Sequence, residues 1–163
     1  MNNKNIVLIG FMGCGKTTIG KELAKNINFN FVDTDCLIEN KENLYIEQIF
    51  NIFGEQYFRK LEKQVYIGVS NLKSSVISTG GGCVKDKENI YHLKKSGTII
   101  YLKATPDQIY ENIKHNDTRP LLKGKDKLNA IYSLLDEREH LYNKYADIVF
   151  DIQDILLLCY QKI

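Results

Sequence analysis

Short apolar runs rich in β-branched residues recur along the chain and alternate with longer stretches in which apolar residues return every three or four positions. A short β-branched run is typical of a buried strand, whereas the longer period is typical of a helix with one buried face. The short runs predict strands at Ile6–Ile9, Phe31–Val32, Val76–Ser78, Thr98–Leu102 and Ile148–Phe150.

The longer stretches predict helices whose ends are fixed only to within a few residues. Thr105 precedes Pro106, which is the pattern of a helix cap followed by proline at the first helical position. Strands that alternate with helices form a parallel sheet covered by helices on both faces, so we expect an α/β fold. The predicted helices are Lys16–Asn26, Asp35–Lys41, Ile46–Phe53, Glu55–Asn71, Lys87–Lys95, Pro106–Lys114, Leu128–Tyr145 and Gln153–Gln161.

Length and charge restrict the classes of function. The 163 residues suit one domain, spanning 1–163, and 44% hydrophobic with 26% charged residues is ordinary for a globular protein. A net charge of +2 is too small for the electrostatic surface of a nucleic-acid or membrane-surface protein. We therefore expect neither nucleic acid nor membrane as a partner.

The four cysteines form no CxxC pair, so the sequence indicates neither a zinc site nor a disulfide framework. No apolar run approaches the roughly 20 residues that span a bilayer. The apolar stretch Ile6–Met12 is also too short for a signal-peptide core. These observations predict a soluble, cytoplasmic protein.

The segment Gly10–Thr17 reads GFMGCGKT, which satisfies the P-loop pattern G-x-x-x-x-G-K-[ST] between a predicted strand and a predicted helix. Such a loop turns backbone N–H groups and a helix N-terminus toward phosphate oxygens. Lys16 is then expected at the β- and γ-phosphates, with the Thr17 hydroxyl on Mg²⁺. The residues expected to bind a nucleotide are Gly13, Cys14, Gly15, Lys16, Thr17 and Thr18.

Cys14 lies inside this loop, where N–H dipoles and Lys16 would favour a thiolate. The simpler interpretation is a small side chain that the loop tolerates. If the thiolate forms, bound nucleotide should protect Cys14 from alkylation.

A P-loop by itself is compatible with motors, switches and small-molecule kinases, so other residues must distinguish between these classes of protein. No N-K-x-D motif of a guanine-specific switch follows a strand. Asp33 and Asp35 stand at the end of the second predicted strand, and residues two apart on a strand point the same way. One of these carboxylates could hold water around a metal ion, and the other could accept a proton or a hydrogen bond from an acceptor hydroxyl. Alternatively, Asp35 could cap the following helix.

A second glycine cluster, Gly80–Gly82, follows the third predicted strand. Three glycines in a row lose much backbone entropy, which indicates that a ligand or another backbone approaches too closely for a Cβ atom. A plain flexible turn is the alternative.

Only three of the 22 basic residues are arginines. Arg138 follows Leu128, Ile131 and Leu135 at helical spacing, so it faces inward and needs an anion, either Asp33 or a substrate. Arg59 lies beside an apolar stripe, three residues before Glu62, and a surface ion pair with Glu62 is the alternative to a substrate contact.

Arg119 lies in a polar connection between two predicted helices. Such a loop suits a lid, at about 114–126, that brings a cation to the transferred phosphate and excludes water. An ordinary exposed loop arginine is the alternative.

Taken in order, these motifs closely resemble those of shikimate kinases, a family of small P-loop kinases of aromatic amino-acid biosynthesis. The resemblance covers nearly the whole chain. It implies a three-layer P-loop NTPase fold of the nucleoside monophosphate kinase type, with a five-stranded parallel sheet flanked by helices. It also implies that ATP phosphorylates the 3-hydroxyl of shikimate with one Mg²⁺ ion. The motifs are Gly10–Thr17, Asp33–Asp35, Phe58–Glu62, Thr79–Gly82, Arg119–Leu121 and Arg138 with Tyr142.

The resemblance assigns roles to individual residues. Lys16, Asp35 and Arg119 would be catalytic, with Arg119 on the ATP phosphates and Asp35 as base at the shikimate hydroxyls. Thr17 would bind Mg²⁺ directly and Asp33 through water. The resemblance places the substrate helices at about 35–62, and we expect a monomer. The shikimate contacts would be Asp35, Phe50, Phe58, Arg59, Gly80, Gly81, Gly82 and Arg138.

Two segments depart from the family pattern. Relatives often carry an adenine-stacking arginine before the lid, where this chain has Lys114 and His115. The chain also lacks a proline-containing loop after the last predicted strand, where Asp151–Asp154 leads into an apolar end. The alternatives are a gluconate or nucleoside monophosphate kinase, or a nucleotide-dependent switch without catalysis.

Overall fold

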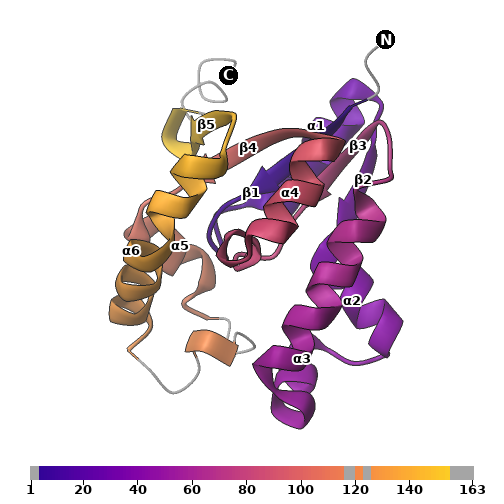
Figure 1. The fold of residues 1–163 in the computed structure, drawn as a ribbon. Coiled ribbons are helices and arrows are strands. Elements are labelled where there is room, and N and C mark those ends of the chain that lie inside the picture. The colour runs from indigo at the N-terminus through magenta and orange to yellow at the C-terminus, as the bar shows by residue number, and fades with distance from the viewer. Residues whose placement is uncertain (1–3, 116–119, 123–125, 155–163) are drawn as a thin grey trace.

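A computed structural model describes residues 4–115, 120–122 and 126–154. Its strands form a single five-stranded sheet in the order β2-β3-β1-β4-β5, and all neighbouring strands run parallel (Figure 1). The predicted α/β architecture is therefore confirmed, and each predicted strand is present. The strands are β1 (Asn5–Ile9), β2 (Asn30–Asp33), β3 (Ser75–Ser78), β4 (Gly97–Lys103) and β5 (Ile148–Asp151).

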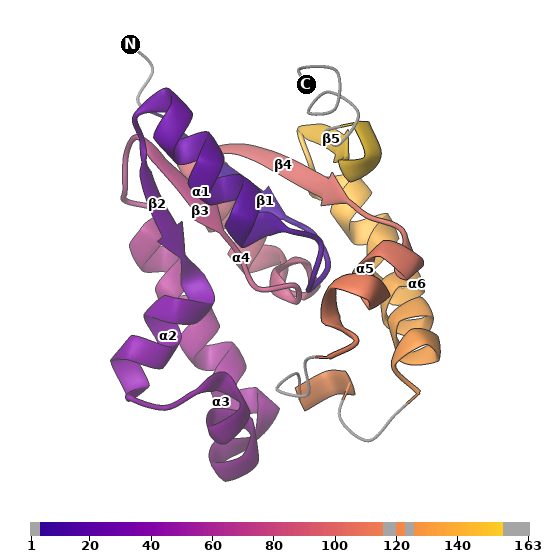
Figure 2. The same cartoon turned by 180° about the vertical axis from the view of Figure 1, so that it is seen from behind.

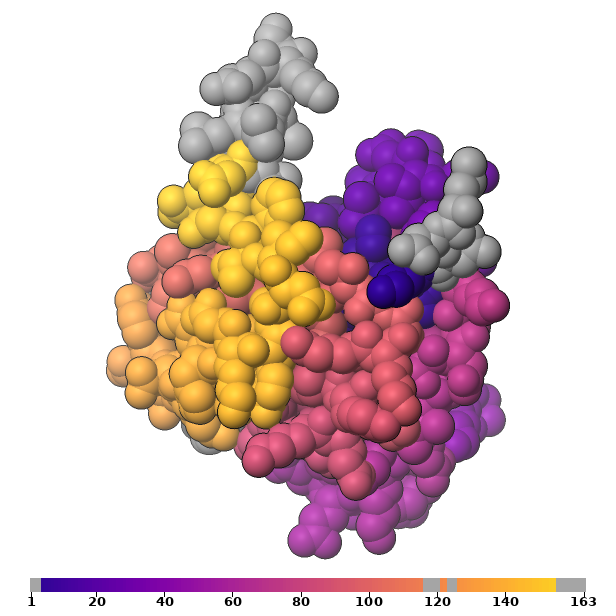
Figure 3. Space-filling view, turned by 45° about the horizontal axis from the view of Figure 1, so that its top comes forward, coloured from indigo at the N-terminus to yellow at the C-terminus, as the bar shows by residue number. Residues whose placement is uncertain are grey.

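Helices cover both faces of the sheet. Figures 1 and 2, seen from opposite sides, place α4 over one face and α1 over the other. In the space-filling view α4 lies between α3 and the α6–β5 segment (Figure 3). The helices are α1 (Lys16–Ile27), α2 (Thr34–Glu42), α3 (Ile46–Val69), α4 (Lys87–Ser96), α5 (Pro106–Ile113) and α6 (Lys127–Tyr145), with 3₁₀ turns η1 (Cys83–Lys85) and η2 (Pro120–Leu122).

The central strand β1 is the middle of the hydrophobic core. It pairs with β3 on one side and β4 on the other, so that Ile6 lies opposite both Val76 and Thr98. Val7, Leu8 and Ile9 are fully or almost fully buried. A strand that is covered on both faces needs apolar side chains in both directions, which explains why β1 reads as a continuous apolar run.

Helix α2 and most of α3 form an arm beyond the carboxyl end of the sheet, whereas the end of α3, with Tyr66 and Val69, packs in the main core (Figures 1 and 2). The arm has its own small apolar cluster, in which Ile38 of α2 packs with Ile49, Phe58 and Leu61 of α3. Because β2 leads directly into α2, the arm stands beside the strand ends where ligands of parallel sheets bind.

Gly54 breaks the regularity of α3. Its φ of 80° and ψ of 171° are not helical, so the element is two helical pieces joined at a kink. The predicted boundary between helices 46–53 and 55–71 is thus found as a kink and not as a loop. A positive φ favours glycine, which has no Cβ to clash with the backbone.

The helical caps follow the sequence signals. Thr105 caps α5 in a capping box with Gln108, and Pro106 opens the helix as expected. The last predicted helix, 153–161, falls mostly outside the described residues. Among the helices of the described part, none is long and apolar enough to cross a membrane.

Candidate active site

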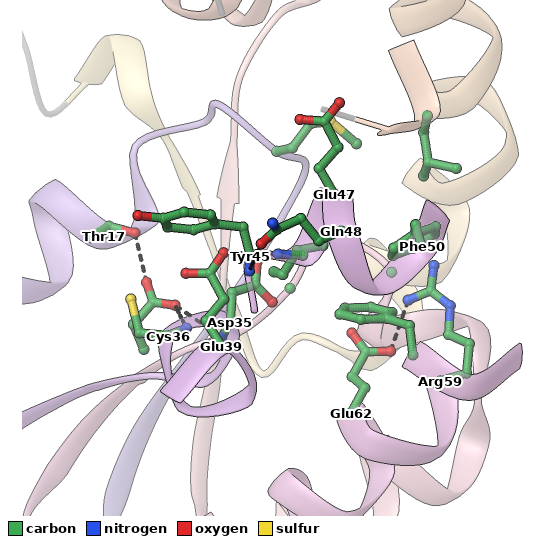
Figure 4. Close-up of a pocket in the computed structure, with 18 of the residues that line it drawn as sticks. Thr17, Asp35, Cys36, Glu39, Tyr45, Glu47, Gln48, Phe50, Arg59 and Glu62 are labelled. Atoms are coloured by element: carbon green, nitrogen blue, oxygen red, sulfur yellow. Dashed lines mark hydrogen bonds and ion pairs between the residues drawn. The ribbon is translucent and has the colours of Figure 1, made fainter. Parts of the chain in front are cut away.

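A cavity of about 750 Å³ opens at the carboxyl end of the sheet, between the P-loop, the arm, the glycine loop and α6. Figure 4 shows Thr17, Asp35 and Cys36 on one side of it and Arg59 with Glu62 on another. Segments from four distant parts of the sequence therefore meet around one space. The candidate residues that line it are Thr17, Asp33, Asp35, Phe50, Phe58, Arg59, Gly80, Gly81, Gly82 and Arg138.

The P-loop joins β1 to α1 as predicted. Gly15 has a φ of 91° and directly precedes the first residue of α1, a conformation that suits glycine. The Gly13 carbonyl accepts a hydrogen bond from Asn112 Nδ2 of α5 at 2.8 Å, which ties the loop to the neighbouring helix. Thr17 and Thr18 are exposed in the first turn of α1.

Lys16 is buried and bonds to its own loop. Its Nζ donates to the Gly10 and Phe11 carbonyl oxygens at 2.8 and 2.9 Å and lies 3.7 Å from Cys14 Sγ. Cys14 is only 1% exposed. Alkylation of Cys14 is therefore sterically hindered before any nucleotide binds, which removes the basis for the protection expected from the sequence.

Asp33 joins the P-loop to the arm. Its Oδ2 accepts a hydrogen bond from Thr17 Oγ1 at 2.9 Å, and its Oδ1 accepts from the backbone N–H groups of Asp35 and Cys36. Asp33 is consequently the N-cap of α2, and the alternative that assigned this cap to Asp35 is wrong. The helix begins at Thr34, so strand alternation does not place the two carboxylates, although both line the cavity.

The glycine loop is in close contact with the rest of the site. A Cβ on Gly80 would lie 2.8 Å from Glu62 Oε1 and 2.9 Å from Asp35 Oδ1. A Cβ on Gly81 would lie 3.0 Å from the Met12 nitrogen of the P-loop. These positions exclude larger side chains because their neighbours are too near, as the close-approach interpretation predicts.

Arg59 is held between two carboxylates. Its Nη1 lies 2.8 Å from Glu62 Oε2, and its Nη2 lies 2.9 Å from Glu55 Oε1. The ion pair with Glu62 forms as predicted but not on the surface, because Glu62 is only 1% exposed. Burial lowers the pKa of the Arg59 guanidinium, but Glu62 and Glu55 outweigh it and raise that pKa above its ordinary value.

Glu62 is a site residue that the sequence reasoning placed wrongly. Its Oε1 accepts a hydrogen bond from the Tyr66 hydroxyl at 2.9 Å, so both of its oxygens are bonded inside the protein. Burial and the nearby Glu62 raise the pKa of Tyr66 well above its ordinary value, which keeps the hydroxyl a donor. The spacing of Phe58, Glu62 and Tyr66 by four residues is the signal that predicts burial.

Arg138 is 2% exposed and lies on the inward face of α6, as its spacing predicts. Its Nη1 lies 3.5 Å from the Gly81 carbonyl oxygen, and its Nε has no hydrogen-bond partner among the described residues. The expectation that Asp33 could supply its anion is not met, since the oxygens of Asp33 are bonded to Thr17 and to the α2 N-terminus. A buried guanidinium with an unused donor favours an external anion.

Phe50 and Phe58 form an apolar wall of the cavity. Their ring centroids are 4.8 Å apart, and the Arg59 guanidinium lies 5.2 Å from the Phe58 ring centroid. Tyr45 also lines the cavity and is absent from the sequence analysis, whereas Met12 and Leu121, which line it too, appear there only as parts of motifs. Arg119, and with it most of the predicted lid at 114–126, lies outside the described residues.

The site combines groups that a phosphoryl transfer to an anionic acceptor requires. A P-loop lysine and helix N-terminus suit phosphate, Asp35 suits a hydroxyl, and the guanidiniums of Arg59 and Arg138 suit a carboxylate. No cluster of three or more His, Cys, Asp or Glu side chains that could cage a metal occurs in the described part of the chain.

Comparisons with known proteins agree with this geometry. The family model for shikimate kinase matches residues 12–155. A shikimate kinase of Caldanaerobacter subterraneus subsp. tengcongensis is 50% identical over 93% of this chain and 88% of its own length. A solved shikimate kinase of Acinetobacter baumannii, in complex with shikimate, has 32% identity and a TM-score of 0.89 over 98% of this chain and 94% of its own.

A shikimate kinase of Aquifex aeolicus gives a further structural match, with 38% identity and a TM-score of 0.78 over 94% of both chains. The sequence and structure matches extend over most of the protein, and the family model, from residue 12 to 155, includes most of the P-loop, the arm and α6. This chain therefore belongs to the shikimate kinase family.

Proposed function

We propose that this protein phosphorylates the 3-hydroxyl of shikimate with ATP, giving shikimate 3-phosphate and ADP, a step of aromatic amino-acid biosynthesis. The observation that carries the proposal is one cavity that borders the P-loop and holds Asp35 together with two arginines. Shikimate is a ring that bears hydroxyls and one carboxylate. The chemistry of the cavity matches both ends of that molecule.

The arginines would bind the carboxylate of shikimate. Arg138 supplies a buried guanidinium whose Nε is unused among the described residues, and Arg59 supplies one fixed in place by Glu62. A guanidinium binds a carboxylate through two parallel hydrogen bonds, so these side chains would also set the orientation of the ring. Phe50 and Phe58 would contact its apolar face.

Asp35 would act as the base at the reacting hydroxyl. It accepts the proton as the hydroxyl oxygen forms its bond to the γ-phosphorus, and the bond between that phosphorus and the ADP oxygen breaks. Its place in the first turn of α2, next to Gly80, puts a carboxylate at the cavity wall. Lys16 would leave the loop carbonyls to bind the phosphates, and Gly13, Cys14, Gly15, Thr17 and Thr18 would complete that cradle.

A magnesium ion fits the residues present. Mg²⁺ in kinases keeps several waters and takes few protein ligands, which agrees with a site that offers one hydroxyl and one nearby carboxylate. Thr17 would bind the ion directly and Asp33, 2.9 Å from the Thr17 hydroxyl, would act through water. The ion would neutralise charge on the phosphates.

The predicted lid at 114–126 would close over the nucleotide, with Arg119 at the transferred phosphate. Leu121, which lies in η2 and lines the cavity, supports the idea that this segment faces the substrate. The proposed catalytic unit is a monomer.

The test is release of ADP from ATP and Mg²⁺ in the presence of candidate acceptors. We expect rapid, stoichiometric ADP release in a single turnover with shikimate, and a phosphate ester on its 3-hydroxyl by ³¹P NMR. Gluconate and nucleoside monophosphates serve as matched acceptors for the rival kinases. Faster turnover with either rival, or nucleotide binding without transfer to any acceptor, would reject the proposal.

A further inference from the structure

Tyr142 of α6 reaches the glycine loop from the core side. Its hydroxyl donates a hydrogen bond to the Gly81 carbonyl oxygen. The side chain is fully buried, and its ring stacks on Tyr101 of β4 with the centroids 5.0 Å apart. Tyr142 is not among the residues that line the cavity, so any effect on a ligand there passes through Gly81.

The same carbonyl oxygen is also the neighbour of Arg138. Arg138 Nη1 lies 3.5 Å from it, at the outer limit of a hydrogen bond. Arg138 and Tyr142 are four residues apart on α6 and therefore share one face of the helix. The tyrosine hydroxyl thus contacts an acceptor that the arginine would otherwise bind alone.

The glycine loop needs such external ties because three consecutive glycines have wide backbone freedom. Thr79 Oγ1 fixes its start by donating to the Leu8 carbonyl oxygen at 2.9 Å. The Cys83 N–H closes its end by donating to the Gly80 carbonyl oxygen at 3.2 Å. Tyr142 holds the peptide between these two points.

Resting on the function proposed above, we propose that Tyr142 is a positioning residue for the acceptor substrate. Its hydroxyl holds the Gly81 carbonyl, which fixes the glycine loop and leaves the Arg138 guanidinium available for the substrate carboxylate. Without that hydroxyl, the Gly81 carbonyl has Arg138 as its remaining donor in the described part of the chain. The peptide and the substrate carboxylate then compete for one guanidinium.

The Tyr142 hydroxyl remains a donor over the working range of pH. Burial raises the pKa of Tyr142 well above its ordinary value, and the nearby Arg138 lowers it by less. The raised pKa keeps the proton on the oxygen at neutral and mildly alkaline pH. The role of Tyr142 therefore predicts an effect on substrate binding that does not change with pH in that range.

Two single-atom variants test this role. Tyr142→Phe removes the hydrogen bond to the Gly81 carbonyl oxygen. Tyr101→Phe is the matched control, because Tyr101 belongs to the same stacked pair and its hydroxyl makes no hydrogen bond to a described residue. We expect Tyr142→Phe to raise the shikimate KM and the calorimetric Kd about tenfold, as for the loss of one hydrogen bond. The ATP KM should stay unchanged, and Tyr101→Phe should leave both KM values as in the wild type.

A double variant locates the effect. If Tyr142 acts through Arg138, then Tyr142→Phe added to Arg138→Lys should weaken shikimate binding by much less than the product of the single effects. If the effects of the two substitutions on the shikimate Kd multiply, Tyr142 and Arg138 act independently and the role proposed for Tyr142 is wrong.

Several results would overturn the role of Tyr142. These are an unchanged shikimate Kd in Tyr142→Phe, an equal rise in the ATP and shikimate KM values, or the same rise in Tyr101→Phe. The last two outcomes would indicate general loosening of the core. A wild-type protein that binds no shikimate would instead overturn the proposed function on which this role rests.

Discussion

Arg138 carries a charge in a place that water scarcely reaches. The residue is 2% exposed, and its guanidinium lies 5.9 Å from the Phe11 ring centroid and has no carboxylate partner among the described residues. Leaving a charge unpaired inside a protein costs several kcal/mol, so such an arrangement persists only where an anion arrives from outside. The site is in this sense incomplete until its substrate binds.

Arg138→Lys tests this interpretation, because lysine keeps the charge but loses the planar pair of donors. We expect the shikimate KM to rise by about ten- to a hundredfold, in line with one charge-assisted hydrogen bond. The ATP KM should change little, because Arg138 borders the acceptor side of the cavity. Steady-state kinetics with each substrate varied in turn give both values, and an unchanged shikimate KM would remove Arg138 from the site.

Glu62 and Glu55 both pair with Arg59, but their surroundings differ. Glu62 is 1% exposed and bonds to two partners, whereas the Glu55 side chain is 47% exposed. We expect Glu62→Gln to lower the free energy of unfolding by about 1–3 kcal/mol, because it weakens a buried charge-assisted bond. The matched Glu55→Gln should cost under about 1 kcal/mol, as for an exposed ion pair.

Urea titration of both variants measures these free energies. Glu62→Gln should in addition raise the shikimate KM, since Arg59 loses the partner that fixes its position. Equal destabilisation by the two substitutions would show that the burial of Glu62 contributes nothing to the pair.

The burial of a single residue was predictable where the helical period alone decided which way its side chain points. The spacing of Arg138 on its helix predicted its burial, because α6 is regular from Lys127 to Tyr145. The same rule applied to α3 would place Glu62 on the face of Phe58 and Tyr66, but its charge favoured a surface pair with Arg59. The structure buries it because Tyr66 and Arg59 satisfy both oxygens. The periodicity of one helix does not show whether both oxygens of a buried carboxylate will find hydrogen-bond donors.

At the scale of elements, the sequence predicts the strands and most helices because each has a clear period and clear ends. The difference at Asp33 is instructive. Strand alternation was expected to align Asp33 and Asp35, but the chain turns helical at Thr34 and Asp33 becomes the cap. The 3₁₀ turn at Cys83–Lys85 was not predicted, since three residues are too few to show a period.

Two glycines of α3 make a matched pair for testing its kink. Neither Gly54 nor Gly68 has an atom within 4 Å of a Cβ added there, but only Gly54 has a positive φ, of 80°. We expect Gly54→Ala to destabilise the protein by about 1–2 kcal/mol through backbone strain. Gly68→Ala should instead stabilise it by about 0.5–1 kcal/mol through helix propensity.

Denaturant unfolding of both variants distinguishes these signs. A Gly54→Ala variant as stable as the wild type would mean that α3 straightens without cost. If α3 does straighten, its N-terminal piece moves relative to Arg59, and the shikimate KM reports that movement.

At the scale of the whole molecule, the site depends on contacts between segments that no local pattern relates. The glycine loop touches the P-loop at Met12 and the arm at Asp35 and Glu62, and it accepts bonds from α6 at Gly81. The sequence predicted that something lies close to these glycines. It did not predict which side chains lie there, because that depends on how α3 and α6 pack around the sheet.

The predicted lid acts at this scale too, because it would close one part of the molecule over another. Arg119 lies outside the described residues. If Arg119 contacts the transferred phosphate, Arg119→Ala should lower kcat by about 10³-fold or more. The change in the shikimate KM should be smaller than the change in kcat. Single-turnover measurement at saturating shikimate and ATP gives the rate. A loss of only a few-fold would remove Arg119 from the reacting phosphate.

ATP and shikimate are expected to bind different segments, so one variant should lose the stabilisation given by one ligand and keep that given by the other. A ligand at a hundred times its Kd adds about 2.7 kcal/mol to the free energy of unfolding, which raises the melting temperature of a protein of this size by about 5–10 °C. We expect Arg138→Lys to lose most of the shift given by shikimate and to keep that of ATP with Mg²⁺. Lys16→Ala should show the opposite pattern.

Each variant is compared with its own ligand-free melting temperature, so a general loss of stability does not affect the comparison. If the shifts fell together in both variants, the acceptor and phosphate sites would not be separate, and the division of the cavity into a P-loop side and an Arg138 side would be wrong. Opposite losses would show that ATP depends on the P-loop and shikimate on the Arg138 side of the cavity, while the glycine loop lies close to the P-loop at Met12 and to the arm at Asp35 and Glu62.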